Sequence, residues 1–162
     1  MESYAEPEAS PAAPSLSAEE EEILRRAQHI ADTVLFPRAQ ETDRASEPPR
    51  DNLRVLAEAG LLGITSPKEY GGSAVSGACQ RAFTELLTAA CGTTWFVMTQ
   101  HLGACGMLAG SKNPDLRERY LRDMAAGRHL VGVAFGHLRR PGAMLRAEAV
   151  PGGYVLNGVA PW

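Results

Sequence analysis

The stretch EAGLLGITSPKEYGG, from Glu58 to Gly72, limits the possible folds of this chain more than any other part of the sequence. Gly60 suits the left-handed residue that ends a helix, and the apolar residues after it can enter a core. Pro67 prevents the helix from continuing, and the pair Gly71-Gly72 permits a tight reversal that bulkier residues resist. We therefore expect a helix end, a buried apolar run and a turn that leads to another helix.

Helical periodicity surrounds this stretch on both sides. Apolar residues recur at steps of three and four, which places them on one face of a helix. Ser17 and Glu20 have the spacing of a capping box, Pro37 is expected to kink the first helix, and Pro48-Pro49 fits the start of the second. The sequence predicts about five helices, over residues 17–46, 48–60, 75–90, 95–108 and 113–127.

The fourth predicted helix is apolar nearly all round, so we expect it at the centre of a bundle. Gly92 is expected to end the third helix, and Thr93 or Thr94 is expected to cap the start of the fourth helix. Asn113-Pro114 is a typical cap and first-turn pair for the fifth helix. The residues of that helix predicted to face inward are Leu116, Tyr120, Leu121 and Met124.

The pattern changes from helical to strand-like after residue 128. Short β-like runs occupy residues 130–135, 147–150 and 154–156. Pro151-Gly152-Gly153 separates the last two runs at hairpin distance, and Asn157-Gly158 is a strong turn signal. The predicted fold class is therefore mainly α, with a bundle of about five helices followed by the first strands of an incomplete β domain.

Composition divides the chain into three parts. Residues 1–22 hold seven acidic residues and no basic residue, whereas the whole chain has a net charge of −3. We expect a disordered acidic tail over 1–16, a helical domain over 17–128 and the start of a β domain over 129–162. The tail has neither the basic start nor the long apolar run of a signal peptide.

Several classes of function find no support in the sequence. No window reaches the length of a membrane span, and we expect neither a membrane nor a nucleic acid as a partner. The three cysteines, Cys79, Cys91 and Cys105, lack metal-site spacing, so they are interpreted as buried free thiols in a cytoplasmic protein. No metal site, nucleophile elbow or phosphate-binding loop is predicted.

Three motifs in order resemble the acyl-CoA dehydrogenase family. They are EAGLLGITSPKEYGG, MTQHLGACGMLAGSKNPDLRERYLRDMAAGRH and the final GGYVLNGVAPW. The family implies an N-terminal helical domain, a middle β domain and a C-terminal four-helix domain. FAD lies between the last two, and the full-length protein is expected to be a homo-oligomer.

The resemblance also implies a reaction. Family members dehydrogenate acyl-CoA thioesters: a base removes the α proton, the β hydrogen leaves as hydride to the flavin, and electrons pass to an electron-transfer flavoprotein. The family's catalytic glutamate belongs to the C-terminal domain, which has no counterpart in this sequence. We therefore assign no catalytic residue, and expect this chain to be a truncated and inactive portion of such an enzyme.

The resemblance assigns three flavin contacts. Trp162 matches the aromatic residue beside the flavin, and Phe135 and Gly136 occupy the place of the family's flavin-edge loop. The family's Thr-Glu-Pro and Gly-Ser-Asp elements are absent there. Backbone N–H groups can still donate to a flavin, because that contact needs no particular side chain.

Other polar residues are interpreted as structural. His101 is expected to be a hydrogen-bonded core histidine, and Tyr70 and Glu69 to pack within the turn. The basic residues that follow Gly136 form either a solvated loop or a replacement phosphate site for CoA or FAD. They are His137, Arg139 and Arg140.

Two other functions remain open. The lost Thr-Glu-Pro element is compatible with a flavin-dependent monooxygenase of the same fold. Alternatively, the chain is a non-catalytic homologue that acts as a helical interaction module.

Overall fold

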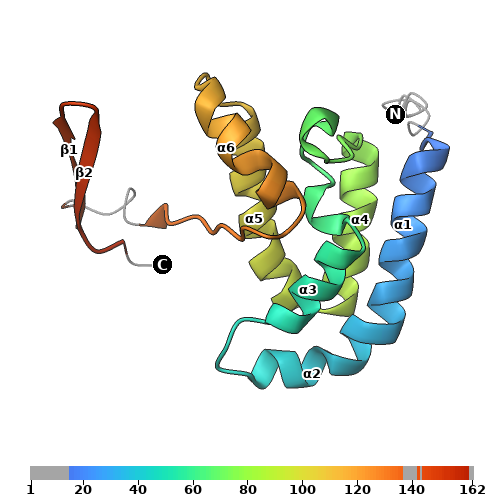
Figure 1. The fold of residues 1–162 in the computed structure, drawn as a ribbon. Coiled ribbons are helices and arrows are strands. Elements are labelled where there is room, and N and C mark those ends of the chain that lie inside the picture. The colour runs from blue at the N-terminus through green and yellow to red at the C-terminus, as the bar shows by residue number, and fades with distance from the viewer. Residues whose placement is uncertain (1–14, 137–141, 143, 161–162) are drawn as a thin grey trace, which may run out of the picture.

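The computed structural model describes residues 15–136, 142 and 144–160. Helices form a bundle, and a two-stranded hairpin lies apart from it (Figure 1). The elements in chain order are α1 (Ala18–Ile30), a π-helical turn (Ala31–Leu35), α2 (Phe36–Arg44), α3 (Arg50–Glu58), two 3-10 turns (Leu61–Gly63 and Lys68–Tyr70), α4 (Gly77–Ala90), α5 (Gly92–Ala109), α6 (Pro114–Ala125), β1 (Leu145–Val150) and β2 (Gly153–Gly158).

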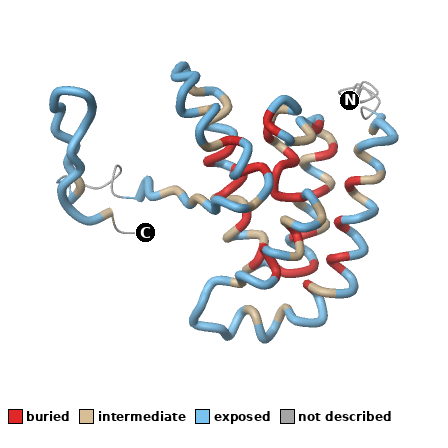
Figure 2. The backbone as a smooth tube through the Cα atoms, in the orientation of Figure 1, coloured by how far each residue is buried: buried red, intermediate tan, exposed pale blue. Residues whose placement is uncertain are grey.

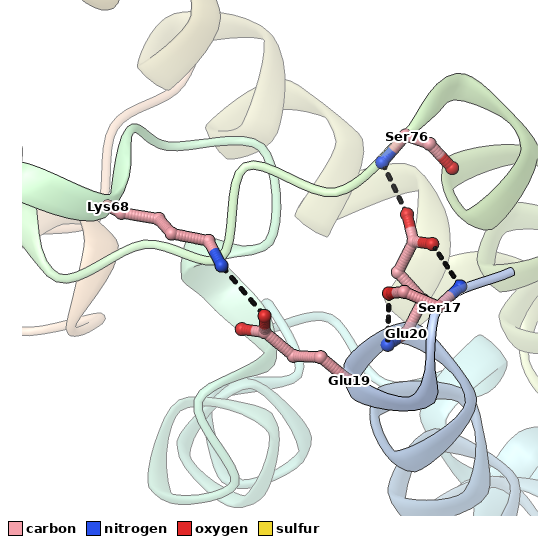
Figure 3. Close-up of polar contacts among 5 residues, drawn as sticks. All are labelled: Ser17, Glu19, Glu20, Lys68 and Ser76. Carbon is pink, nitrogen blue, oxygen red and sulfur yellow. Dashed lines mark hydrogen bonds and ion pairs between the residues drawn. The ribbon is translucent and has the colours of Figure 1, made fainter.

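The first helix begins as predicted. The Ser17 side chain accepts a hydrogen bond from the backbone N–H of Glu20 (3.2 Å), and the Glu20 carboxylate accepts one from the backbone N–H of Ser17 (2.8 Å), which completes the capping box (Figure 3). The same carboxylate also accepts from the backbone N–H of Ser76 (2.7 Å), the N-cap of α4. One side chain therefore ties together the starts of two helices.

The predicted kink before residue 46 is a π-helical turn. The backbone N–H of Phe36 donates to the carbonyl of Ala31, five residues back, and Pro37 lies in the first turn of α2. A proline has no N–H to continue the ladder of hydrogen bonds, so the backbone widens just before it. Because α1, the π turn and α2 are continuous, the bundle has five helical segments, as predicted.

The stretch from Glu58 to Gly72 is confirmed as a helix end and a tight turn. Gly60 and Gly71 are left-handed, with φ of 73° and 83°. At Gly72 a Cβ atom would lie 2.1 Å from the carbonyl oxygen of Ser66, so only glycine fits there. The apolar residues between these turns, LLGI, are all buried.

The start of α5 differs from the prediction. The helix begins at Gly92, and the sulfur of Cys91 accepts from the backbone N–H of Thr94 (3.5 Å) at its cap. Thr94 is not a cap because its buried hydroxyl accepts a hydrogen bond from Asn52 on α3 (2.9 Å). The expected central place of this helix is confirmed, since α5 contacts α2, α3, α4 and α6.

Buried residues gather where the helices face one another (Figure 2). The main core includes fully buried Leu56, Phe83, Leu87 and Met98. The three cysteines are buried and unpaired, as expected. None of the helices within the described residues has the length and apolar character that crossing a bilayer requires.

The hairpin departs from the prediction at its end. A two-residue turn, Pro151-Gly152, joins the strands, and Gly152 has φ of 86°, which suits the second position of a type II turn after proline. Asn157 and Gly158 form no turn; they pair with Arg146 and Leu145. Ladder hydrogen bonds therefore prevail over the local turn preference.

The predicted strand over 130–135 is also absent from the structure. In the described part of the chain, β1 and β2 pair only with each other, and a strand without a partner cannot form a ladder. Most of the predicted tail, residues 1–14, lies outside the described residues.

Candidate cofactor groove

An open, mainly apolar groove of about 680 Å³ lies between the second half of α5, helix α6 and the segment 129–135. The segment and the predicted flavin contact Phe135 form one wall. The lining residues are Ala104, Met107, Leu108, Ser111, Leu116, Tyr120, Met124, His129, Val131, Gly132, Val133, Ala134 and Phe135.

The end of α6 directs the chain along this groove. Gly127 is left-handed (φ 70°), its N–H donates to the carbonyl of Met124 (2.9 Å), and the N–H of Arg128 donates to that of Asp123 (2.9 Å). This pair of bonds is a Schellman motif. A Cβ atom at Gly127 would lie 2.5 Å from the Cβ of Ala57, so the exit from the helix depends on glycine.

His101 holds the next part of the segment. The backbone N–H of Val131 donates to His101 Nδ1 (3.2 Å), and Nε2 donates to the carbonyl of Met124 (3.0 Å). Burial lowers the pKa of the His101 imidazole, because charge is disfavoured in the core. The interpretation as a hydrogen-bonded core histidine is confirmed.

Beyond Val131 the segment offers unused donors. Among the described residues, none accepts a hydrogen bond from the backbone N–H groups of residues 132–135. These residues are exposed or half-buried, and no atom lies within 4 Å of the place where a Cβ of Gly132 would be. The wall of the groove therefore contains backbone N–H groups that have no acceptor in the described part of the chain.

An aromatic pair lies at another side of the groove. The rings of Tyr120 and His129 are 5.7 Å apart between centroids, and the guanidinium of Arg119 lies 5.2 Å from the Tyr120 ring. Leu116 was predicted to face the core, but 41% of its surface is exposed, because it lines the groove instead. The helical period predicts the correct face but cannot separate a core from an open groove.

The predicted site residues have different outcomes. Phe135 lines the groove with 49% of its surface exposed, and Gly136 follows it and is exposed. Trp162 lies outside the described residues, as do the members of the predicted basic loop, His137, Arg139 and Arg140. Whether any of these residues contacts a flavin therefore remains a prediction.

The turn residues pack as expected. Tyr70 is buried and donates from its hydroxyl to the Glu118 carboxylate on α6 (3.0 Å), a bond that raises the pKa of Tyr70. The carbonyl of Glu69 accepts from the Arg122 guanidinium (3.0 Å). The turn is thus bonded to α6, the helix that forms the groove.

A second cleft, of about 470 Å³, lies between α4 and α5. Gly103 and Gly106 of α5 leave room there, and Thr99, Trp95 and Phe83 form other parts of its lining. The hydroxyl of Thr65, also in the lining, is buried and has no hydrogen-bond partner within the described residues. No pattern in the sequence indicates this cleft, because it forms only where two helices approach each other.

No group of three or more histidine, cysteine or acidic side chains with the geometry of a metal site occurs within the described residues.

Two curated relatives are about equally similar to the chain. A 3-(aryl)acrylate reductase of Clostridium sporogenes is 30% identical over 86% of this chain and 39% of its own length. A mitochondrial isovaleryl-CoA dehydrogenase of Arabidopsis thaliana is 30% identical over 82% of this chain and 34% of its own. The chain thus spans between 34% and 39% of the length of these relatives.

Solved structures share the fold. A glutaryl-CoA dehydrogenase of Mycobacterium smegmatis superposes with a TM-score of 0.75 at 22% identity, over 88% of this chain and 38% of that one. The FAD complex of PigA superposes with a TM-score of 0.74 at 22% identity, over 90% of this chain and 40% of that one.

The profile of the family described as "Acyl-CoA dehydrogenase, N-terminal domain" matches residues 17–128. This range holds all six α-helices of the structure, both glycine-closed turns of the opening stretch and the wall that α6 contributes to the groove. The chain belongs to the acyl-CoA dehydrogenase family.

Proposed function

We propose that this chain supplies the helical domain and the first β strands of an FAD-dependent oxidoreductase that acts on the CH–CH bond of acyl-CoA thioesters. The observation that carries the proposal is the groove wall of residues 132–135, whose backbone N–H groups have no acceptor among the described residues. In the family resemblance this same segment is the flavin-edge loop. Family membership and an unused row of donors thus point to one place.

The residues of the wall fit one edge of a flavin. A flavin ring has carbonyl oxygens and ring nitrogens that accept hydrogen bonds, and backbone N–H groups can serve them without a specific side chain. Phe135 and Gly136 would hold that edge, with Phe135 adding apolar contact area. When bound, FAD supplies the hydride acceptor, and the chain's own residues orient the ring and exclude water.

The cleft between α4 and α5 has room for the acyl part of the substrate. Its lining combines the glycines of α5 with apolar and hydroxyl side chains, and it carries no charged residue. An aliphatic chain would be desolvated there without burying a charge. We include this cleft in the proposal as the substrate side of the same domain.

Partners and location follow from the same proposal. A homo-oligomer of the full-length protein, electron transfer to an electron-transfer flavoprotein and a cytoplasmic location are all predictions. So is the absence of turnover by the 162-residue chain alone, because no carboxylate in it is assigned as the base.

The proposal is tested by nuclear magnetic resonance on the 162-residue chain. Adding FAD is expected to shift the amide signals of residues 131–136, and adding an acyl-CoA is expected to shift those of Thr99 and Gly103. The Phe135→Ala variant should weaken the FAD response. Phe36→Ala is the matched control, because Phe36 is also exposed (67%) but lies away from the groove.

The other outcomes separate the alternatives. If FAD causes no shift of these amide signals at any concentration tested, the result contradicts the flavin assignment. It then favours the alternative that the chain is a non-catalytic helical interaction module. FAD-linked turnover of an acyl-CoA by this chain alone would contradict the predicted inactivity. A monooxygenase is favoured if the reduced flavoprotein consumes oxygen with an aromatic substrate and does not respond to acyl-CoA.

A further inference from the structure

One buried side chain joins three parts of the groove. His101 lies on α5 with 3% of its surface exposed, Nε2 bonds to the carbonyl of Met124 near the end of α6 (3.0 Å), and Nδ1 bonds to Val131 in the wall (3.2 Å). His101 is 23 residues from Met124 and 30 residues from Val131 in sequence. The imidazole therefore links α5 by hydrogen bonds to the end of α6 and to the wall segment that contains Val131.

The two bonds determine the protonation of the ring. A backbone N–H can only donate, so Nδ1 must be unprotonated to accept from Val131. A carbonyl can only accept, so Nε2 must carry the proton that is donated to Met124. The structure thus requires the neutral ring with its proton on Nε2.

The surroundings favour this neutral form. The sulfur of Cys105, one turn further along α5, lies 3.5 Å from Nε2, and burial raises the pKa of that thiol, which keeps it uncharged. His129, in the segment after α6, disfavours charge on His101 through repulsion. Tyr120 of α6 packs against the cluster that contains Cys105, and the Ser66 side chain lies beside the Cys105 thiol.

We propose that neutral His101 is a positioning residue, which sets the placement of residues 131–135 along the groove by accepting the Val131 N–H at Nδ1. Within the described part of the chain, Val131 is the last residue of the wall with a hydrogen bond to the bundle, and Val133 after it packs against the cluster of Ala104, Cys105 and Met124. The Val131 bond therefore fixes the start of residues 132–135, whose N–H groups have no acceptor among the described residues. The role in flavin binding rests on the proposed function; the placement itself does not.

The test compares two variants that each keep half of the imidazole. In His101→Asn the side-chain oxygen takes the place of Nδ1 and can still accept from Val131. In His101→Gln the side-chain nitrogen takes the place of Nε2 and can still donate to Met124. Amide hydrogen exchange at Val131 is expected to be roughly tenfold or more faster in His101→Gln than in the wild type, and close to wild type in His101→Asn.

Either of two exchange results would overturn the proposal. Val131 could stay protected in His101→Gln, or the two variants could exchange equally fast, which would mean that ring packing and not the Nδ1 bond holds the segment. If the variants fail to fold, the wild type decides. Its imidazole nitrogen shifts must report an unprotonated Nδ1 and a protonated Nε2, and the opposite tautomer would overturn the proposal.

The pH profile gives a signature that packing alone would not produce. Once Nδ1 is protonated it cannot accept, so Val131 protection, corrected for the intrinsic rate, should fall when the pH drops below the ordinary range of histidine. A profile without this loss contradicts the proposal. These measurements contain no FAD, so a failure to bind FAD would contradict the proposed function and leave the placement by His101 intact.

Discussion

The helical bundle and the β hairpin are built from equally clear sequence patterns, yet they differ in how they are held. The bundle buries whole side chains such as Leu56 and Leu87 between helices. In the hairpin only Leu145 is even half-buried, and every other strand residue is exposed. A clear sequence pattern therefore specifies the secondary structure of each region, whereas the stability of a region depends on how much of its surface is buried against other elements.

The hairpin has an apolar face without a cover in the described residues. Paired residues share a face, and the pairs Ala147–Leu156 and Ala149–Tyr154 are all apolar, while Arg146 pairs with Asn157 on the other face. A two-stranded hairpin is marginal in water without a surface to pack on. In the bundle, by contrast, α5 is covered by four other helices.

The largest expected difference in the free energy of unfolding comes from replacing one leucine by alanine in the bundle and one in the hairpin. Leu87→Ala should lower the free energy of unfolding by about 2–5 kcal/mol, because it leaves a cavity in the core. Leu156→Ala should change it by less than about 0.5 kcal/mol, because 64% of that side chain is already exposed. Urea unfolding measures both. Equal losses would show that the two regions unfold as one unit.

A smaller effect within the bundle is expected at low pH. The backbone N–H of Ser17 and then Ser76 hold the pKa of Glu20 down at about 2 (Figure 3). Since the ordinary pKa of this carboxyl is 4.5, the stabilisation is fully present above that pH and is lost as the pH falls toward about 2. Glu20→Gln should flatten the dependence of stability on pH across this window.

The control for Glu20 is Glu21→Gln, which removes the same charge from the same turn of α1. The side chain of Glu21 makes no hydrogen bond or ion pair within the described residues. Its variant should therefore keep the acid dependence of the wild type. If both variants flatten the curve alike, net charge and not the double cap is responsible.

The smallest effect on the bundle is expected from breaking the hairpin. A Cβ atom at Gly158 would lie 1.9 Å from the carbonyl oxygen of Met144, so Gly158→Ala cannot keep the β1–β2 pairing at that end. Amide exchange at Val159, whose N–H donates to the Met144 carbonyl (2.9 Å), should rise. The free energy of unfolding of the bundle should stay within about 0.5 kcal/mol. A larger loss would mean that the hairpin supports the bundle.

Three residues or pairs show where a local sequence pattern fails to predict the structure. Thr93 or Thr94 was predicted as the cap of α5, but the Thr93 hydroxyl donates to Asp43, fifty residues away in sequence, and the Thr94 hydroxyl accepts from Asn52, forty-two residues away. Leu116 has the helical spacing of a core residue but lines a groove. Asn157-Gly158 has the letters of a turn but pairs in a ladder. For Thr94 and for Asn157-Gly158 a partner distant in sequence prevails over the local preference, whereas Leu116 is exposed because the groove beside it is open.

The local signals that succeeded involve few neighbours. The capping box of Ser17 and Glu20, the left-handed Gly60 and the Asn113 cap are settled within one turn of backbone. The family resemblance identified Phe135 as a candidate flavin contact, and Phe135 lies in the groove wall. Its contact with a flavin stays a prediction.

By itself, the sequence determined where the helices other than α5 begin, which face of each amphipathic helix is apolar, and to which family the chain belongs. These properties depend on backbone conformations and on residue spacing along one segment. Only the tertiary structure decided that α5, α6 and the segment after Gly127 enclose a groove, and that His101 bonds to Val131. A groove and a long-range hydrogen bond exist only once separate elements meet, and no local pattern encodes where those elements will lie.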